Sequence, residues 1–515
     1  MGSLKTEGSA PWELAGAKKR EALASSIPSE WRIPQNLLPP ESQEDVTGWP
    51  EASGWFTPKE LAITDLNAAE LLPKLASGEL KSIDVTKAFC KRAAAAHQLT
   101  NCLSETCFDR AFTTAQALDE HLERTGKPVG PFHGLPISLK DNFNLKGLDA
   151  TVGIASHVGS PAEYDAALAT LLEEAGAVFY VKTNVPTAMM IAESVNNVFG
   201  RTVNPRNRNL TSGGSSGGES ALIVMKGSPW GIGTDIGGSL RIPAACTGIF
   251  TLRPSFGRFP ADPAWAAKRQ SIVNRQTWQY DPRCVPIAWR DVELPSKLKI
   301  AVMWNDGMVR PTPPVARALH ETVEKLKTAG HEIVEWDPKD QKEGLSLLDR
   351  MFVADGGISI KKELDKTEEP WRPEMAAYSK AKELGTYDMW QLHLQRTAFQ
   401  KRYLDRWVAA GIDAILCPTT PFTSVKNGTF KHVGYTGVYN VLDYSCVSFP
   451  TGLTADKSVD APSSGDTPLG PVCEAVHAEY DPNDVHGMPI SLQLIARRLE
   501  EEKAIAMVKQ VLEVI

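Results

Sequence analysis

Short apolar segments alternate with helical patterns along much of this 515-residue chain. The apolar run Leu135–Leu139 precedes a helical pattern over Ala166–Ala175, and after Gly176 a second apolar run covers Val178–Val181. The same order of strand, helix and strand patterns recurs between residues 298 and 336. Alternation of this kind is typical of a wound α/β fold, in which helices pack on a sheet. We therefore predict an α/β fold.

Residues 1–58 have a different pattern from the rest of the chain. A helix is expected over Glu13–Leu23, whereas the Pro-rich stretch Pro28–Pro58 has neither helical nor strand periodicity. We predict that residues 1–58 form an arm that packs on the body as an extended strap. Residues 59–515 are expected to form one large domain, because no flexible linker divides them.

Helix boundaries and loops can also be assigned from the sequence. Asp65 is a candidate N-cap for a helix that ends near Gly78, and Ser82 is a candidate N-cap for the next helix. Residues 259–297 are rich in Pro, Trp and Arg, and residues 456–471 in Ser, Asp, Pro and Gly. We expect an irregular excursion in the first segment and an exposed loop in the second.

The composition excludes several classes of protein. Lys and Arg number 55 and Asp and Glu 62, a net charge of −7, and 42% of residues are hydrophobic. This is the profile of a globular protein, and the acidic balance disfavours nucleic acid as a partner. The first residues form no apolar signal segment, and no stretch approaches the ~18 apolar residues that span a membrane. We expect a cytoplasmic protein that does not bind membranes.

Cysteine and histidine patterns give no metal or disulfide framework. The eight cysteines are scattered without a Cys-x-x-Cys pair, so we expect buried free thiols in a reducing compartment. The ten histidines include no His-Glu-x-x-His motif, so a catalytic metal is not expected. His133 is expected to be structural.

Two glycine- and serine-rich segments, Thr211–Ser220 and Gly233–Pro243, carry the strongest chemical signal. Glycine allows positive φ angles and close approach of the backbone, so such runs shape turns whose amides face one site. A P-loop motif is absent, and the match to a dinucleotide-binding pattern is weak. Residues 213–217 satisfy Gly-x-Ser-x-Gly formally, and that nucleophile elbow would also need one of the later histidines, such as His432, His477 or His486. A flexible loop that forms no site is the structural alternative to these functional interpretations.

A third alternative is a serine hydrolase whose base is lysine. The two segments and Gly134–Asn142 upstream resemble the motifs of the amidase signature family, in the family's order and close to its spacing. The similarity extends from about Ile63 to the C-terminus. Further segments that resemble the family are Lys182–Pro186, Asn197–Pro205, Asp413–Pro421 and Gly487–Leu494. This resemblance implies a large mixed, twisted β-sheet covered by helices on both faces, with residues 59–515 as the catalytic domain.

The resemblance also implies roles for individual residues. Ser239 matches the acylated nucleophile, Ser215 the bridging serine that follows a cis peptide bond, and Lys140 the general base, with Ser216 hydrogen-bonded to the lysine. The implied oxyanion hole consists of the amides of Ile236, Gly237, Gly238 and Ser239, and Met189 is expected near the acyl pocket. Asp235 and Arg241 flank the nucleophile turn and are expected to orient it.

The chemistry of such a set follows from its residue types. A serine hydroxyl is a weak nucleophile that needs a base within hydrogen-bond reach. Lys140 can serve only as a neutral amine, and burial among apolar residues of its strand would lower its pKa from about 10.4. Asp141 would oppose this, but adjacent strand residues point to opposite faces.

We therefore expect an amidase without a cofactor that converts a small carboxamide to an acid and ammonia or an amine. The arm segment Ile27–Arg32 and the segment Val438–Tyr444 are most similar to fungal general amidases of the acetamidase type. A homodimer is a possible assembly. Three alternatives stay open: an amidotransferase-type subunit, a membrane-bound lipid amidase, which the missing anchor disfavours, and a catalytically silent binding protein. Ser296–Lys299 and Ser379–Lys382 satisfy Ser-x-x-Lys but lack the accompanying motifs of a β-lactamase-like site.

Overall fold

The computed structural model describes residues 9–259, 273, 275–462 and 467–515, so parts of both loop-rich segments lie outside the described residues. Helices of the first half of the chain are α1 (Pro11–Ser26), α2 (Trp49–Ala52), α3 (Pro58–Thr64), α4 (Ala68–Ser77), α5 (Ser82–Thr100), α6 (Phe108–Thr125), α7 (Ala167–Glu174), α8 (Gly217–Val224) and α9 (Arg241–Thr247). Those of the second half are α11 (Pro313–Thr328), α12 (Gln341–Phe352), α13 (Ile358–Asp365), α14 (Ala376–Ser379), α15 (Thr386–Ala410), α16 (Gly434–Leu442), α17 (Pro471–Ala478) and α18 (Glu501–Leu512).

A four-stranded sheet lies in the N-terminal half, in the order β1-β3-β2-β8. The central strand β2 pairs in parallel with β3 and with β8, and β1 pairs antiparallel with β3. The bounds are β1 (Leu103–Thr106), β2 (Pro136–Lys140), β3 (Val178–Thr183) and β8 (Gly231–Ile232). Lys140 is thus the last residue of a central strand.

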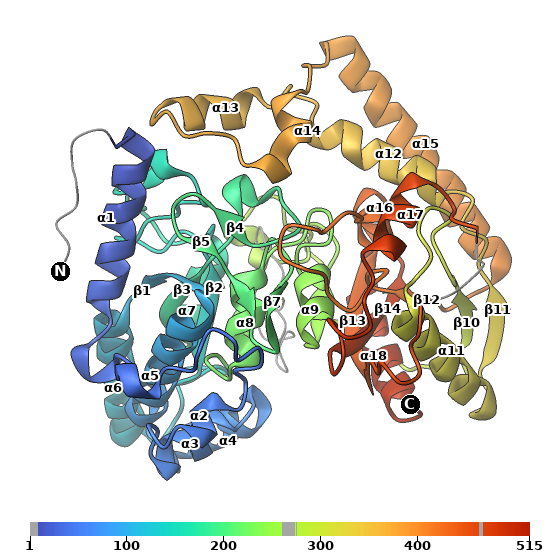
Figure 1. Cartoon of the computed structure of the whole chain (residues 1–515). Coiled ribbons are helices and arrows are strands. Elements are labelled where there is room, and N and C mark those ends of the chain that lie inside the picture. The colour runs from blue at the N-terminus through green and yellow to red at the C-terminus, as the bar shows by residue number, and fades with distance from the viewer. Residues whose placement is uncertain (1–8, 260–272, 274, 463–466) are drawn as a thin grey trace.

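A six-stranded mixed sheet lies in the second half of the molecule, in the order β11-β10-β12-β14-β13-β9. Its strands are β9 (Thr251–Arg253), β10 (Lys299–Val302), β11 (Glu332–Glu335), β12 (Ala414–Pro418), β13 (Ser445–Thr454) and β14 (Pro489–Ala496). Two small hairpins pair β4 (Val195–Asn196) with β5 (Gly200–Arg201) and β6 (Val203–Asn204) with β7 (Asn207–Thr211). Helices α8 and α9 lie between the two sheets (Figure 1).

The α/β fold and its mixed strands are confirmed. The described strands form two main sheets and two hairpins, where one large mixed sheet was expected. Two predicted caps are wrong. Asn67, not Asp65, caps α4, because Asn67 forms a reciprocal capping box with Glu70. The amides of Ser82 and Ile83 at the start of α5 donate to the carboxylate of Asp119 on α6, a partner from a different helix.

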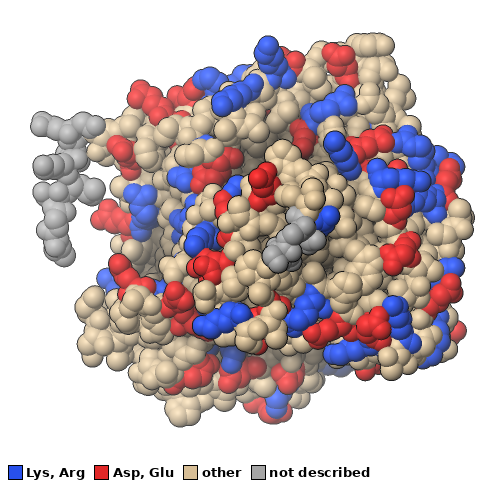
Figure 2. All heavy atoms as spheres, turned by 45° about the vertical axis from the view of Figure 1, so that its right-hand side comes forward, with Lys and Arg blue, Asp and Glu red and all other residues tan. Residues whose placement is uncertain are grey.

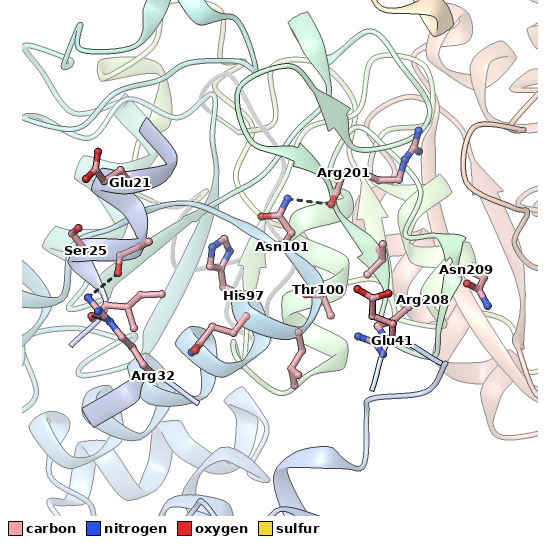
Figure 3. A pocket seen from close by; sticks show the side chains of 15 residues that line it. Glu21, Ser25, Arg32, Glu41, His97, Thr100, Asn101, Arg201, Arg208 and Asn209 are labelled. Atoms are coloured by element: carbon pink, nitrogen blue, oxygen red, sulfur yellow. Dashed lines mark hydrogen bonds between the residues drawn. The ribbon is translucent and has the colours of Figure 1, made fainter. Parts of the chain in front are cut away.

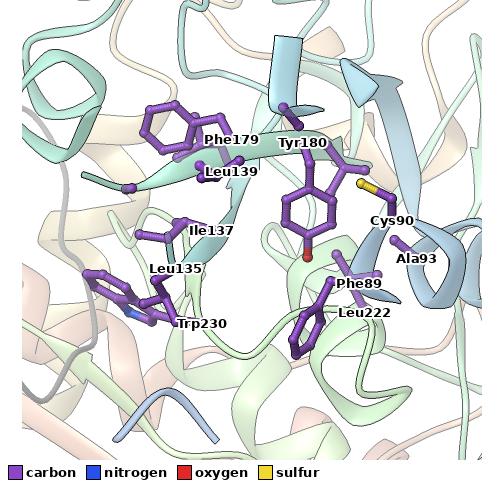
Figure 4. Close-up of a cluster of buried hydrophobic side chains, with 14 of the residues drawn as sticks. Phe89, Cys90, Ala93, Leu135, Ile137, Leu139, Phe179, Tyr180, Leu222 and Trp230 are labelled. Carbon is purple, nitrogen blue, oxygen red and sulfur yellow. The ribbon is translucent and has the colours of Figure 1, made fainter. Parts of the chain in front are cut away.

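The largest core surrounds the four-stranded sheet. Ile137 and Leu139 of β2, Tyr180 of β3 and Leu222 of α8 gather with Trp230 in one buried cluster (Figure 4). This packing holds β2, and therefore the strand end that carries Lys140, on both sides. All eight cysteines are free thiols, and seven of them are buried, as predicted.

The arm contacts the body at several points, and its α1 lies along one side of the molecule (Figure 1). Lys19 of α1 forms a buried ion pair with Asp149, 2.7 Å between Nζ and Oδ2. Farther along the arm, the amide of Val46 donates to Pro205 O at 2.9 Å. Basic and acidic side chains are interspersed over the face seen in Figure 2. Within the ranges that the structure covers, no helix is both long and apolar enough to cross a membrane.

Candidate active site

Two turns meet between the four-stranded sheet and the six-stranded sheet, a place that we call the seam, and each turn leads into a helix. Ser215 and Ser216 directly precede α8, and Ser239 lies two residues before α9. The helices pack on each other, and the amide of Ser216 donates to Ser239 O at 3.1 Å. The Gly214–Ser215 peptide bond is cis. Two serines that are 24 positions apart in the sequence therefore share one site.

Lys140 reaches this site from the end of β2. Its side chain is fully buried, and Nζ lies 2.7 Å from Ser215 Oγ and 2.5 Å from Thr234 Oγ1. The structure thus places the Lys140 amine against the Ser215 hydroxyl and the backbone of Ser239 against Ser216, and a contact between the hydroxyls of Ser215 and Ser239 stays a prediction. Thr234 was not identified from the sequence, although it lies inside the second glycine-rich segment.

The carboxylate of Asp141, the residue after Lys140, bonds to the segment that follows β2. Its Oδ2 accepts from the amide of Val152 at 2.6 Å and from the hydroxyl of Thr151 at 3.1 Å. The carboxylate that could have stabilised an ammonium form of Lys140 is therefore engaged with the segment that follows β2.

Ser216 supports the site through the backbone of Thr234. Its hydroxyl donates to Thr234 O and accepts from Thr234 N, both at 3.4 Å. These contacts hold the residue whose side chain touches Lys140. The hydrogen bond expected between Ser216 and Lys140 stays a prediction.

Glycine is required at specific positions of both turns. Gly238 has a φ of +134°, and a Cβ there would overlap the hydroxyl of Thr436. A Cβ on Gly214 would lie 2.6 Å from the backbone nitrogen of Glu193. Both turns therefore depend on close approaches that a side chain would prevent.

Asp235 organises the turn that carries Ser239. Its carboxylate accepts from the amides of Gly238 at 2.8 Å and Leu240 at 3.2 Å, from the Arg241 guanidinium at 2.9 Å and from Asn440 Nδ2 at 2.9 Å. The orienting role expected for Asp235 and Arg241 matches these contacts. Asn440 comes from α16, and no local sequence pattern indicated it.

The ion pair between Asp235 and Arg241 shifts the pKa of each partner in the direction that favours its charged form. Burial by itself raises the pKa of Asp235, but the adjacent Arg241 outweighs burial and holds that pKa well below its usual range. Burial likewise lowers the pKa of Arg241, and Asp235 raises it above its usual value. Both side chains are fully buried, and because each partner favours the charged form of the other, the pair stays charged in the interior.

The four amides expected in the oxyanion hole differ in whether they already donate a hydrogen bond within the protein. The amide of Gly238 donates to Asp235 Oδ1 at 2.8 Å, and the expected role of all four amides as oxyanion donors stays a prediction. In the described part of the chain, no internal acceptor is found for the amides of Ile236, Gly237 and Ser239. These three are the amides available to a ligand at the turn.

A cavity of about 920 Å³ borders this turn. Its lining includes Ile236, whose side chain is 62% exposed, together with Phe352 of α12 and Asn440 of α16. Phe352 also packs in the cluster that contains Met190, the neighbour of Met189. Met189 itself is half-buried, with a φ of +59° in the short 3₁₀ turn Thr187–Met189.

A second cavity, of about 760 Å³, lies elsewhere, between the arm, the end of α5 and β7. Figure 3 shows Glu21 and Ser25 of α1 on one side and Arg208 and Asn209 on the other. Lys140, Ser215 and Ser239 are not among the lining residues of either cavity.

The histidines weighed for a nucleophile elbow have other partners. His432 Nε2 lies 2.5 Å from Asp306 Oδ2, and His477 Nε2 lies 3.1 Å from Arg310 O. Among the hydrogen bonds of the described residues, none joins a histidine to Ser215 or Ser239. The geometry of the described residues therefore gives no support to a histidine-based nucleophile elbow.

Comparison with known proteins identifies the family. A family model described as Amidase matches residues 84–275 and 264–505. The chain is 40% identical to an acetamidase of Emericella nidulans, with 97% of each chain covered, and 39% identical to an acetamidase of Aspergillus oryzae, with 98% of each covered. A solved structure of a fatty acid amide hydrolase superposes with a TM-score of 0.92 at 33% identity, covering 98% of this chain and 95% of that one. The chain belongs to the amidase signature family and is a hydrolase that acts on amides.

Proposed function

We propose that this protein is an acetamidase-type amidase that hydrolyses short linear carboxamides through an acyl-enzyme on Ser239. The observation that carries the proposal is the contact series from Lys140 to Ser215, and from the neighbouring Ser216 to Ser239. Serine acylation requires a base that reaches the nucleophile directly or through a relay hydroxyl, and Ser215 is placed to be that relay.

The first step transfers one proton along this series. Neutral Lys140 takes the proton of Ser215, which in turn takes the proton of Ser239 as its oxygen attacks the amide carbonyl. The carbonyl oxygen becomes an oxyanion, and the amides of Ile236, Gly237 and Ser239 donate to it. Gly238 contributes indirectly, because its bond to Asp235 fixes the turn.

The second half of the reaction reverses the proton path. The Lys140 ammonium returns the proton through Ser215 to the departing nitrogen, the C–N bond breaks, and ammonia or an amine leaves. A water molecule then gives its proton to Ser215 and Lys140 and attacks the ester carbonyl. The Lys140 ammonium returns that proton through Ser215 to Ser239 Oγ as the ester C–O bond breaks, so that the carboxylic acid is released and Ser239 is restored.

The relatives support the choice of substrate. Acetamidases at 40% and 39% identity cover nearly the whole chain, so acetamide and similar short amides are the first candidates. We place the acyl group near Met189, on the side of the turn where Phe352 packs. No cofactor takes part in these steps, and the other expected partners, such as a second copy of the chain, are not needed for them.

The direct test is Ser239→Ala, with Ser379→Ala as a matched control. Ser379 is an exposed serine in a Ser-x-x-Lys sequence, and its hydroxyl bonds only locally, to Ala376 O at 3.1 Å. We expect Ser239→Ala to lose acetamide turnover and labelling by a fluorophosphonate, and Ser379→Ala to retain both. A folded Ser239→Ala protein with unchanged turnover would refute the proposal, and an unlabelled, inactive wild type would indicate the silent binding protein.

A further inference from the structure

A buried carboxyl group, that of Glu219, is bonded to the two strands next to Lys140. Glu219 is on α8, one helical turn after Ser215, and is 4% exposed. Its Oε2 lies 2.6 Å from Ser138 Oγ and its Oε1 lies 2.8 Å from Thr183 Oγ1. Ser138 is two residues before Lys140 on β2, and Thr183 is the residue of β3 that pairs with Lys140. Both contacts therefore brace the strand end that carries the lysine.

The contacts beyond Ser138 form an ordered series of oxygen atoms. Ser138 Oγ lies 2.9 Å from Ser228 Oγ, and Ser228 Oγ lies 2.8 Å from the carbonyl oxygen of Trp230. From Glu219 Oε2 to Trp230 O there are thus three hydrogen-bond contacts in sequence. The hydroxyl of Tyr180 donates to Gly227 O at 2.5 Å and is also hydrogen-bonded to the hydroxyl of Ser228, so it adds a contact to this series and no proton.

The series needs three protons, and its hydroxyls supply two. Trp230 O can only accept, and Tyr180 gives its own proton to Gly227 O, so Ser228 donates to one of these two oxygens and Ser138 must then donate to Ser228. The 2.6 Å contact between Ser138 and Glu219 is left, and its proton can come only from the carboxyl group. If Glu219 were ionised, one contact would place two oxygen lone pairs against each other at 2.6–2.9 Å in the protein interior.

We infer that Glu219 is a neutral carboxylic acid that donates to Ser138, so that the group bonded to the strands next to Lys140 carries no negative charge. The inference rests on the proposed function, in which Lys140 acts as a neutral base. Glu219 is a positioning residue, because it acts through Ser138 and Thr183 on the strand and not on the substrate.

The surroundings of Glu219 shift it toward the neutral acid. Burial raises its pKa to about 7, although the hydroxyls of Ser138 and Thr183 and the positive charge of Lys140 oppose the rise, and a neutral Lys140 would not exert the last of these effects. The other titratable groups that act on this site are the thiol of Cys102, whose pKa burial raises to about 12, and the phenol of Tyr180, whose pKa burial raises well above its usual value. Both are neutral near pH 7, and the backbone of Gly231 closes the remaining side.

A neutral acid matters for the base. A carboxylate close to Lys140 would favour the ammonium form and raise the lysine pKa, whereas a carboxylic acid has no such effect. The same group can thus fix the strand through two hydrogen bonds without opposing the deprotonation of the lysine.

The test compares Glu219→Gln with Glu219→Leu. A glutamine amide donates to Ser138 and accepts from Thr183, as the acid does, so we expect kcat/KM within about threefold of wild type and an unchanged acid limb of its pH profile. Leucine cannot replace the two buried hydrogen bonds, and we expect a loss of about tenfold or more. If Glu219 is ionised, Glu219→Gln removes a charge beside Lys140, and the acid limb moves to lower pH.

Infrared difference spectra of wild type minus Glu219→Gln measure the proton directly. We expect the carbonyl stretch of a carboxylic acid at neutral pH, and carboxylate bands in its place would overturn the inference. Should Glu219→Gln fail to fold, Ser228→Ala gives the same information. Without Ser228, the Ser138 proton is free to bond a carboxylate, so the acid band should disappear at a lower pH than in wild type, and an unchanged titration would contradict the proton count.

These readouts separate the inference from the proposed function. The infrared band reports the proton on Glu219 whether or not Lys140 is the base. Loss of the proposed function would appear instead as activity that survives Ser239→Ala.

Discussion

The substitution Asp235→Asn tests how the nucleophile turn is held. The carboxylate of Asp235 faces only donors: the guanidinium of Arg241, the amides of Gly238 and Leu240, and the side-chain amide of Asn440. Asparagine would turn one of its two acceptors into a donor that faces those donors, and would leave Arg241 as an uncompensated buried charge. Breaking a buried pair in this way costs about 3–5 kcal/mol.

The expected outcome is a loss of about 3–5 kcal/mol in the free energy of unfolding, measured by urea denaturation at pH 7. Turnover should fall as well, because the turn also presents the free amides, and misplacing one oxyanion donor costs about 10²–10³-fold in kcat. The matched control is Asp405→Asn, which removes an exposed pair with Lys401 one turn away on α15. Such a pair is worth only about 0.3–0.5 kcal/mol.

The pH dependence gives a second check on the same pair. Because the pKa of Asp235 is lowered in the folded state, its contribution is fully present above the unfolded pKa of about 3.9 and is lost as pH falls toward the lower folded value. The stability gap between wild type and Asp235→Asn should therefore be constant near neutral pH and narrow below about pH 4. If the free energy of unfolding of Asp235→Asn at pH 7 lies within about 0.5 kcal/mol of the wild-type value, the reasoning is refuted.

Three further predictions concern the other parts of the site. Gly238→Ala should lose about 1–3 kcal/mol and most turnover because its Cβ would overlap Thr436, whereas Gly411→Ala, at a positive φ with open space around it, should lose stability alone. Lys140→Ala should lower kcat by about 10²–10⁴-fold, with partial recovery at high pH, where hydroxide can replace the base; a pH-independent loss would argue against that role. Met189→Ala should raise KM for longer acyl amides more than for acetamide, and equal changes across a substrate series would place Met189 outside the acyl pocket.

Local patterns were sufficient to predict the main elements of the fold. The apolar run before Lys140 forms β2, and the glycine-rich segments form the two turns, because both patterns encode their structure within a few residues. The cap of α5 was not predictable in the same way, since Asp119 reaches it from α6. The division into two sheets also depends on long-range pairing, and β8, with two residues, is too short to leave a periodic pattern.

The site shows the same limit at the level of side chains. Lys140, Ser215 and Ser239 were found through motifs, whereas the contact of Thr234 with the lysine and that of Asn440 with Asp235 join residues distant in sequence. The engagement of the Gly238 amide by Asp235 could not be predicted either, because a list of adjacent amides does not tell which one is already bonded.

Because the site lies between the two main sheets, its chemistry depends on how closely the two halves of the molecule pack together. Lys140 is anchored in the four-stranded sheet, whereas Ser239 leads into α9, which packs on β13 and β14 of the other sheet. A slight separation of the two halves on heating would pull nucleophile and base apart before any strand or helix melts. Inactivation should then precede the loss of circular dichroism, so that activity serves as the earliest gauge of docking between the halves.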